Sequence, residues 1–344
     1  MNLEVTVFGG DWGESIVIRF PNGEWGVVDC FASSSDDRSN PALQYLLDQK
    51  VSRLSFVCLT HPHEDHYSGI LQLIKRIPIR DYLQPAVMTP DRLQQLIERD
   101  EALCLSRLSA SQGLLFSLYQ HLGQAIKKKN LNVIPLVLGT TVRTPEVYGG
   151  VAIQAIGPSG NQGTKFETRL SRCFKDSKFD PSVRLLSINQ CSTGLSLQYN
   201  ACKIVLGGDI ESGGWTDLLE QNRDLIRCSK MVKVAHHGSK TGISKGLWEA
   251  HTENVIDPVA VVTPYHRSQL PNARVLRTIK NYGVSVYIAG RLPRRKDTDT
   301  PETGLLKACG AIPRYAGPSG IVKTTIDPSG SITIDTQLGA RKLD

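Results

Sequence analysis

The chain has 344 residues, enough for one large domain or two medium ones, with 40% hydrophobic and 21% charged residues. This composition is ordinary for a globular protein. No apolar stretch approaches the ~20 residues that cross a bilayer, and the N-terminus lacks the pattern of a signal peptide. We therefore expect a cytoplasmic protein without membrane contact. The eight cysteines show no CxxC spacing and are expected to be reduced core residues.

The net charge of +7 is unevenly distributed along the chain. Residues 265–344 carry 13 Lys or Arg and 6 Asp or Glu, so the whole excess lies there, while residues 1–264 are balanced. A basic face attracts polyanions, although surface cations are often only solvated. Residues 265–344 are therefore a candidate nucleic-acid contact; the sequence indicates no particular protein partner.

The first half of the chain begins with strand patterns. Alternating apolar residues predict a strand at 3–8 and a hairpin at 15–30, and proline-initiated helical spacing follows at 41–50. A strand at 54–60 then leads into a helix at 68–77. Two helical segments within about 90–130 are expected to form an insertion or lid.

The second half predicts strands that alternate with helices. A strand at 151–158 is followed by a polar segment, 159–183, that we expect to be a loop. Later strands end at Asp209, at His236 and His237, and at His266, with helical patterns between them. A β-hairpin closes the chain at 321–335. Two successive sets of strands with helical connections predict two sheets packed together with helices outside.

The stretch LTHPHEDHYSG, residues 59–69, holds three of the eight histidines of the chain. His61 and His63 follow the strand at 54–60, where positions two apart face the same way. Asp65 and His66 lie on the turn that leaves this strand. Imidazole nitrogens and carboxylate oxygens suit divalent metals such as Zn²⁺, and four such residues can begin two adjacent sites. A chance polar turn is the alternative.

Two such sites need further ligands, and strand ends offer them. Asp209 ends KIVLGGD and is suited to bridge two metals, while His236 would complete one coordination sphere. Asp29 likewise follows the apolar run GVV at the end of a predicted strand. Each residue alone is a weak signal, because strand-end aspartates are usually turn residues.

The motif THPHEDH resembles the signature of the metallo-β-lactamase superfamily of metal-dependent hydrolases. Residues 8–30, 188–211 and 232–244 also resemble blocks of the soluble hydrolase domain of the competence DNA-uptake channel family. The resemblance covers residues 3–290 and implies an αββα sandwich of two mixed sheets with a dinuclear site at one edge. It implies that the metal ligands are His61, His63, Asp65, His66, Asp209 and His236, supported by Asp29.

The resemblance further implies a division of the chain and a pair of metals. Residues 1–290 would form the hydrolase domain, with the helical insertion at about 90–130, and residues 291–344 a basic extension packed on it. The cofactors would be two divalent ions, zinc or alternatively manganese. One departure concerns a ligand histidine that many superfamily members carry between the first cluster and the bridging acid. Only His121 lies in that interval, within a helical pattern. The membrane segments of the uptake channel are also missing.

Several residues near the ligands are candidates for catalysis or substrate binding. Asp65 could accept a proton from water, and His266 could contact the substrate. His237 could contact the substrate or support a ligand, and the sequence does not decide which of His236 and His237 ligates. Ser239 and Lys240 follow in HHGSKTG, which has features of an anion cradle, although a helix cap and a solvated lysine would look the same.

Three functions remain open at this point. The first is a phosphodiesterase, most simply a nuclease acting on DNA or RNA. The second is a hydrolase of a small-molecule or cell-envelope phosphoester. The third is a metal-stabilised regulatory protein without turnover.

Overall fold

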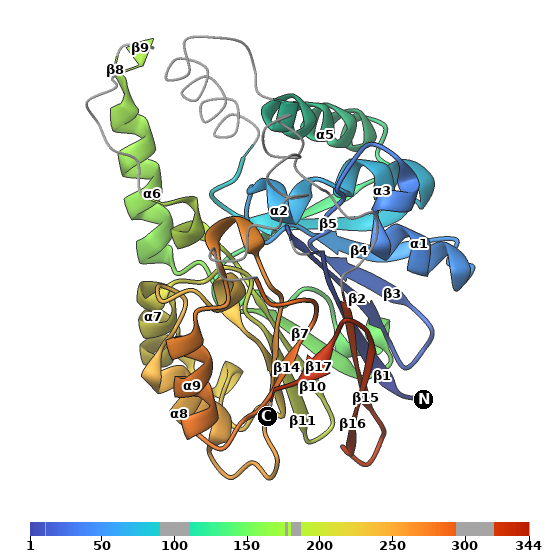
Figure 1. Cartoon of the computed structure of the whole chain (residues 1–344). Helices are drawn as coiled ribbons and strands as arrows, with labels where there is room; N and C mark the ends of the chain where they lie inside the picture. Colours follow the sequence, from blue (N-terminus) through green and yellow to red (C-terminus); the bar gives the residue numbers. More distant parts are fainter. Residues whose placement is uncertain (11, 90–109, 176–177, 180–186, 294–319, 344) are drawn as a thin grey trace, which may run out of the picture.

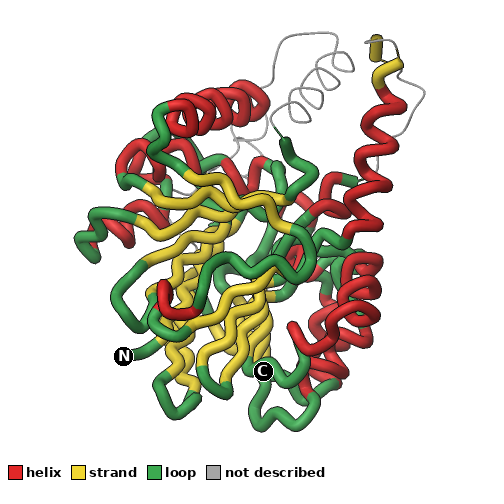
Figure 2. Tube along the Cα trace, turned by 180° about the vertical axis from the view of Figure 1, so that it is seen from behind, coloured by secondary structure: helices red, strands yellow, loops and turns green. Residues whose placement is uncertain are grey.

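The computed structural model describes residues 1–10, 12–89, 110–175, 178–179, 187–293 and 320–343. Its two large sheets lie face to face, and helices cover the outer side of each, as Figures 1 and 2 show from opposite sides. This is the predicted αββα sandwich of two mixed sheets, the architecture of the metallo-β-lactamase fold. None of the helices in the described part of the chain has the length and hydrophobicity that a bilayer crossing requires.

The first sheet runs in the order β16-β15-β1-β2-β3-β4-β5-β6 within the described residues. Strands β3 to β6 are parallel neighbours, and the remaining pairs are antiparallel. The strands are β1 (Leu3–Gly9), β2 (Glu14–Arg19), β3 (Trp25–Val28), β4 (Leu54–Cys58), β5 (Ile79–Pro85), β6 (Asn132–Leu136), β15 (Gly320–Ile326) and β16 (Ile332–Leu338).

The second sheet runs in the order β17-β14-β13-β12-β11-β10-β7 within the same described ranges. Strands β11 to β14 are parallel, as expected for strands joined by helices. The strands are β7 (Val151–Ala155), β10 (Leu195–Tyr199), β11 (Cys202–Leu206), β12 (Met231–Lys233), β13 (Val259–Val262), β14 (Ser285–Ile288) and β17 (Arg341–Lys342). A small pair, β8 (Phe174–Lys175) and β9 (Lys178–Phe179), lies apart.

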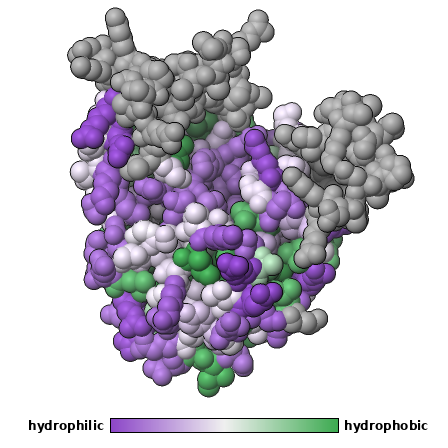
Figure 3. Space-filling view, turned by 60° about the vertical axis from the view of Figure 1, so that its left-hand side comes forward, coloured by the Kyte–Doolittle hydropathy of each residue, from purple (hydrophilic) through white to green (hydrophobic). Residues whose placement is uncertain are grey.

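The helices divide between the two outer faces. Beside the first sheet lie α1 (Pro41–Asp48), α2 (Glu64–Tyr67), α3 (Ile70–Arg76) and α5 (Ala110–Lys127). Beside the second lie α7 (Ser212–Asn222), α8 (Lys245–Thr252) and α9 (Ala273–Asn281). Helix α6 (Gly160–Cys173) instead buries Phe166 and Leu170 in the core of the first sheet. The polar stretch at 160–173 is thus a helix, so our expectation of a loop there was wrong. Figure 3 brings the left-hand side of Figure 1 forward, and hydrophilic side chains cover much of the coloured surface there.

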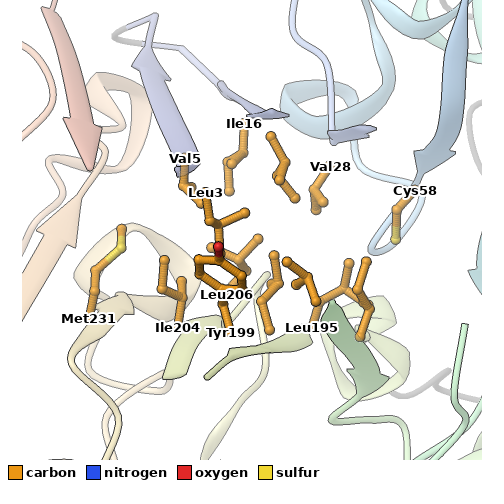
Figure 4. Close-up of a cluster of buried hydrophobic side chains, with 14 of the residues drawn as sticks. Leu3, Val5, Ile16, Val28, Cys58, Leu195, Tyr199, Ile204, Leu206 and Met231 are labelled. Carbon is orange, nitrogen blue, oxygen red and sulfur yellow. The ribbon is translucent and has the colours of Figure 1, made fainter. Parts of the chain in front are cut away.

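Three hydrophobic cores fill the spaces between these four layers. One lies between the sheets and joins residues such as Val5 and Ile16 to Ile204 and Leu206 (Figure 4). A second packs the first sheet against α1, α3 and α5, and a third packs the second sheet against α7, α8 and α9. Every residue of β4 is buried, because both faces of its sheet are covered. Cys30, Cys58, Cys191 and Cys202 are free and buried in these cores, as predicted, whereas Cys228 is only partly buried.

Two regions relate to the predicted division of the chain. Helix α5 connects β5 to its parallel neighbour β6, so residues 110–127 form the crossover between two strands of the sheet. Residues 90–109, the rest of the predicted insertion, lie outside the described residues. Strand β15 of the C-terminal hairpin pairs along its whole length with β1, which makes it part of the first sheet.

Candidate metal centre

The histidine cluster, residues 61–66, follows the C-terminal end of β4 and enters the short helix α2. The carbonyl of His63 accepts hydrogen bonds from the amides of His66 and Tyr67 at 3.0 and 3.1 Å. This turn brings the side chains of Asp65 and His66 back beside that of His61. His61 and His66 are fully buried, and the side chain of Asp65 is 12% exposed.

A first donor group consists of His61, His66 and Asp209, whose ligand atoms lie within 4.8 Å of one another. Asp209 Oδ2 is 3.7 Å from His61 Nε2, and Asp209 Oδ1 is 3.4 Å from His66 Nε2. Asp209 follows β11 after Gly208, which has a φ of +49°; a Cβ there would lie 2.4 Å from the carbonyl of Thr193. The glycine therefore permits the close turn that delivers Asp209 to the cluster.

A second donor group consists of Asp65, His66 and His237, with ligand atoms again within 4.8 Å of one another. Asp65 Oδ2 lies 3.1 Å from His237 Nε2 and 3.6 Å from His66 Nε2. His237 Nδ1 contacts the hydroxyl of Thr263 at 3.0 Å. Such a contact on one ring nitrogen fixes the orientation of the imidazole and leaves Nε2 for a metal.

Two ligand atoms of these groups lack a hydrogen-bond partner within the protein, and they show whether the residues fit a metal; we call them orphaned atoms. His66 Nε2 and Asp209 Oδ1 are both buried without a hydrogen-bond partner. Buried polar atoms are nearly always satisfied, so a ligating nitrogen and a ligating oxygen that face each other without hydrogen bonds are suited to a cation between them. The mixed imidazole and carboxylate set is the one that divalent transition metals prefer. The residues present therefore fit a metal.

The electrostatics of the cluster agree with this fit. Burial lowers the pKa of His61, which keeps its imidazole in the neutral, ligating form. Burial opposes protonation of His66 too, but the carboxylates of Asp29 and Asp209 outweigh it and raise its pKa. Conversely, burial raises the pKa of Asp209, and the surrounding histidines lower it by more. The cluster is a buried concentration of negative charge that favours a cation.

His236 and His237 are adjacent, yet the structure places them differently. Both have left-handed backbone, with φ of 51° and 50°. His237 is buried in the second donor group, whereas His236 is partly exposed, with Nε2 3.8 Å from Asp209 Oδ2. We predicted His236 as a metal ligand and left open which of the two histidines ligates; the geometry favours His237, which forms a donor group with Asp65 and His66. His63 lies on the side of His61, with Nδ1 2.9 Å from His61 Nε2.

Asn189 is a member of the site that the sequence reading missed. It lies in the short turn Ile188–Cys191, and its amide nitrogen is 3.5 Å from Asp209 Oδ2 and 3.2 Å from His236 Nε2. Its Oδ1 is buried without a hydrogen bond. The amide thus lies beside Asp209 and His236, and Asn189 falls in the interval between the first cluster and Asp209 where we noted that a further histidine ligand is missing. An amide oxygen is also a metal ligand, though a weaker one.

Asp29 lies behind His66, as the resemblance implied for a supporting acid. Its Oδ2 is 2.7 Å from His66 Nδ1, and its carboxylate also accepts from the amide and the hydroxyl of Thr60. Carboxylates in this position fix the tautomer of a ligating histidine.

Glu14 and Lys233 form a buried ion pair behind the cluster that no local sequence signal indicated. Glu14 begins β2, and Lys233 ends β12 in the other sheet. Glu14 Oε2 also accepts from the Thr263 hydroxyl at 2.6 Å and lies 3.6 Å from His237 Nδ1. The pair therefore joins the two sheets at the point where His237 is held.

The remaining predicted residues lie around the cluster. His266 does not point into it: Nε2 donates to the carbonyl of Arg291 at 2.7 Å. Its neighbour Tyr265 instead stacks on His237, with ring centroids 5.1 Å apart. Ser239 lines the cavity over the cluster, of about 550 Å³, whereas Lys240 is exposed one residue beyond. We call this space the cluster cavity.

Residues 13–93, which contain the histidine cluster, match the family model described as Metallo-beta-lactamase superfamily. This match covers the strands and turn that supply the first four donor residues and Asp29. No curated protein matches the chain. The finer resemblance to the competence DNA-uptake family stays a prediction.

Several solved structures are similar to this chain, and three of them are described by protein and organism. Igni18, a metallo hydrolase from Ignicoccus hospitalis, is 13% identical over 86% of this chain and 97% of its own, with a TM-score of 0.43. Zn²⁺-bound PqqB from Methylobacterium extorquens is 12% identical over 82% and 97%, with a TM-score of 0.42. CmlA, a diiron β-hydroxylase from Streptomyces venezuelae, is 13% identical over 83% and 52%, with a TM-score of 0.45. Similarities at this level carry no argument about the chemistry of this chain.

Proposed function

We propose that this chain is a metal-dependent phosphodiesterase that acts on nucleic acid. The observation that supports the proposal is the convergence of two His/Asp donor groups on the shared side chain of His66, beside an accessible cavity of about 550 Å³. The donors come from turns after β4, β11 and β12, and the orphaned atoms among them fit a cation. A buried group of this kind has a large desolvation cost without a bound metal.

The donor groups divide naturally between two divalent metals, zinc or manganese. His61 and Asp209 would hold the first, joined by His63, whose ring lies 2.9 Å from that of His61, with Asn189 in place of a further histidine. Asp65, His66 and His237 would hold the second, with Asp209 shared. When bound, the metals supply Lewis-acid activation of water and of the phosphoryl group.

The protein's own residues then orient the ligands and the substrate. Asp29 and Thr263 fix His66 and His237 through their Nδ1 atoms, so both rings direct Nε2 toward the carboxylates of the donor groups. Arg267 is exposed and lines the same cavity, where its guanidinium could bind a phosphate oxygen. The positive excess of residues 265–344, to which Arg267 belongs, supports a polyanionic substrate.

A substrate panel tests the proposal. The purified chain loaded with Zn²⁺ or Mn²⁺ is expected to hydrolyse bis(4-nitrophenyl) phosphate and to cleave DNA or RNA. Asp209→Ala should abolish both reactions while circular dichroism shows a folded protein. Asp224→Ala, which removes a carboxylate that is 85% exposed, should leave both unchanged.

Three outcomes separate the alternatives. Cleavage of bis(4-nitrophenyl) phosphate with intact DNA and RNA would indicate a small-molecule phosphoesterase. Binding to nucleic acid should weaken steeply as salt rises, because phosphate contacts release counterions. Metal binding without hydrolysis of any substrate would contradict the enzymatic proposal and favour a regulatory protein.

A further inference from the structure

A second cavity, of about 510 Å³, opens directly beside the cluster cavity. We call it the side cavity. The two cavities share Glu64, Asp65, Tyr265 and Arg267 as lining residues. Its volume lies within the ~300–1,000 Å³ of typical small-ligand sites. A substrate with its reacting group at the metal cluster would therefore extend its next chemical group into the side cavity.

Three aromatic side chains line the side cavity: Trp12, Phe31 and Tyr265. Trp12 and Tyr265 are partly exposed, so their rings are accessible, whereas Phe31 is 8% exposed. Aromatic residues make up only 6% of the chain, so three aromatic side chains at one small cavity are a local concentration. Such a cavity favours a flat ligand that can stack on the rings.

The loop that carries Trp12 is held against Phe31. The amide of Gly10 donates to the carbonyl of Gly13 at 3.0 Å, which closes a tight turn around Trp12. A Cβ at Gly13 would lie 2.3 Å from the Phe31 ring, and one at Gly10 would lie 2.7 Å from it. Both glycines thus let the turn pack on Phe31 and present Trp12 at the cavity. On the other wall, Tyr265 is oriented by stacking on His237.

The charged side chains around the side cavity are one cation and two carboxylates. Arg267 borders both cavities, and so do Glu64 and Asp65, of which Asp65 belongs to the second donor group. Arginine binds phosphate oxygens and stacks on rings, and aromatic side chains stack on bases of any sequence. This combination fits a nucleotide better than an aliphatic ester or a peptide.

We propose that the side cavity is a stacking subsite for the nucleobase adjacent to the phosphate at the metal cluster, with Trp12 as its principal ring. This inference rests on the proposed function and adds the substrate class: a nucleotide unit, recognised by its base as a flat ring rather than by base identity.

Binding by isothermal titration calorimetry tests the subsite without requiring turnover. The full chain with Zn²⁺ is titrated with thymidine 5′-monophosphate, 2-deoxyribose 5-phosphate and phenyl phosphate. Stacking of one base predicts that thymidine 5′-monophosphate binds about 5- to 150-fold more tightly than the sugar phosphate. Trp12→Ala should remove this difference, and Trp12→Phe should restore part of it.

Trp25→Ala is the matched control. Trp25 begins β3 and is also partly exposed, but its ring packs against Tyr45 and Arg19 rather than at the side cavity. It should retain the preference of the unmodified protein. Equal affinity of the unmodified protein for the nucleotide and the sugar phosphate would overturn the subsite, whatever the variants do. Equal affinity for phenyl phosphate and the nucleotide would overturn the assignment to a nucleobase.

Hydrolysis of bis(4-nitrophenyl) phosphate, measured on the same preparation, separates the two proposals. A Trp12-dependent preference for the nucleotide without hydrolysis would support the subsite and contradict the phosphodiesterase. Hydrolysis without this preference would contradict the subsite alone.

Discussion

Removal of Lys233 should destabilise the protein more than removal of any exposed lysine. Lys233 and Glu14 are both fully buried and paired across the two sheets. Lys233→Met leaves the Glu14 carboxylate with the hydroxyl of Thr263 as its remaining short donor. Because an uncompensated buried charge is costly, loss of one partner of such a pair lowers the free energy of unfolding by about 3–5 kcal/mol.

Urea unfolding, followed by circular dichroism in the presence of a chelator, measures this cost without a contribution from bound metal. The matched control is Lys323→Met, which breaks a more exposed pair with Glu4, 2.7 Å apart and with Lys323 29% exposed. We expect that control to cost at most about 1 kcal/mol.

The double variant completes the cycle. Glu14→Gln alone should also destabilise, and the double variant Glu14→Gln/Lys233→Met should cost clearly less than the two single costs together, because the buried charge is gone. Strictly additive costs, or a cost of Lys233→Met no larger than that of Lys323→Met, would refute the reasoning.

Three further predictions concern separate parts of the chain. Asp29→Asn should weaken metal affinity about 10- to 100-fold in a chelator competition, because His66 loses its ionised acceptor; unchanged affinity would contradict this role. Asn189→His should raise the zinc content measured by elemental analysis, since it places an imidazole beside Asp209, and an unaltered content would count against the missing-ligand interpretation. Burial lowers the pKa of His251 to about 4, below its ordinary value of ~6.5, so the unfolded chain binds an extra proton between these pH values. The free energy of unfolding should therefore fall by about 3 kcal/mol from pH 6.5 to pH 4, a slope that His251→Gln should remove; an equal slope in both proteins would refute it.

Local sequence determined the parts of the site that depend on a few neighbouring residues. The spacing of His61, Asp65 and His66 after a buried strand predicted that their side chains converge, and the structure brings them together. Asp209 could be identified because it is a carboxylate that directly ends the apolar strand pattern KIVLGGD. The two sheets with outer helices also followed from the order of strand and helix patterns.

Contacts between distant segments decided the rest of the site. The choice between His236 and His237 has no sequence signal, because both follow the same strand; two successive left-handed residues turn the second into the cluster. Asn189 lies in an irregular turn without periodicity, so only its position beside Asp209 shows its place. Residues 159–183 looked like a loop because they are polar, yet 160–173 forms a helix whose buried Phe166 packs in the core between the first sheet and its helices.

The sequence by itself therefore determined the architecture and the donors that lie close together in the chain, His61, Asp65 and His66, since both depend on short-range spacing and on alternation of apolar residues. Only the tertiary structure decided how the donors are supported and what surrounds them. Glu14 and Lys233 are 219 residues apart and meet because the two sheets pack face to face. Trp12 and Tyr265 line one cavity for the same reason. Such pairings depend on the relative placement of whole sheets, a property that no local pattern encodes.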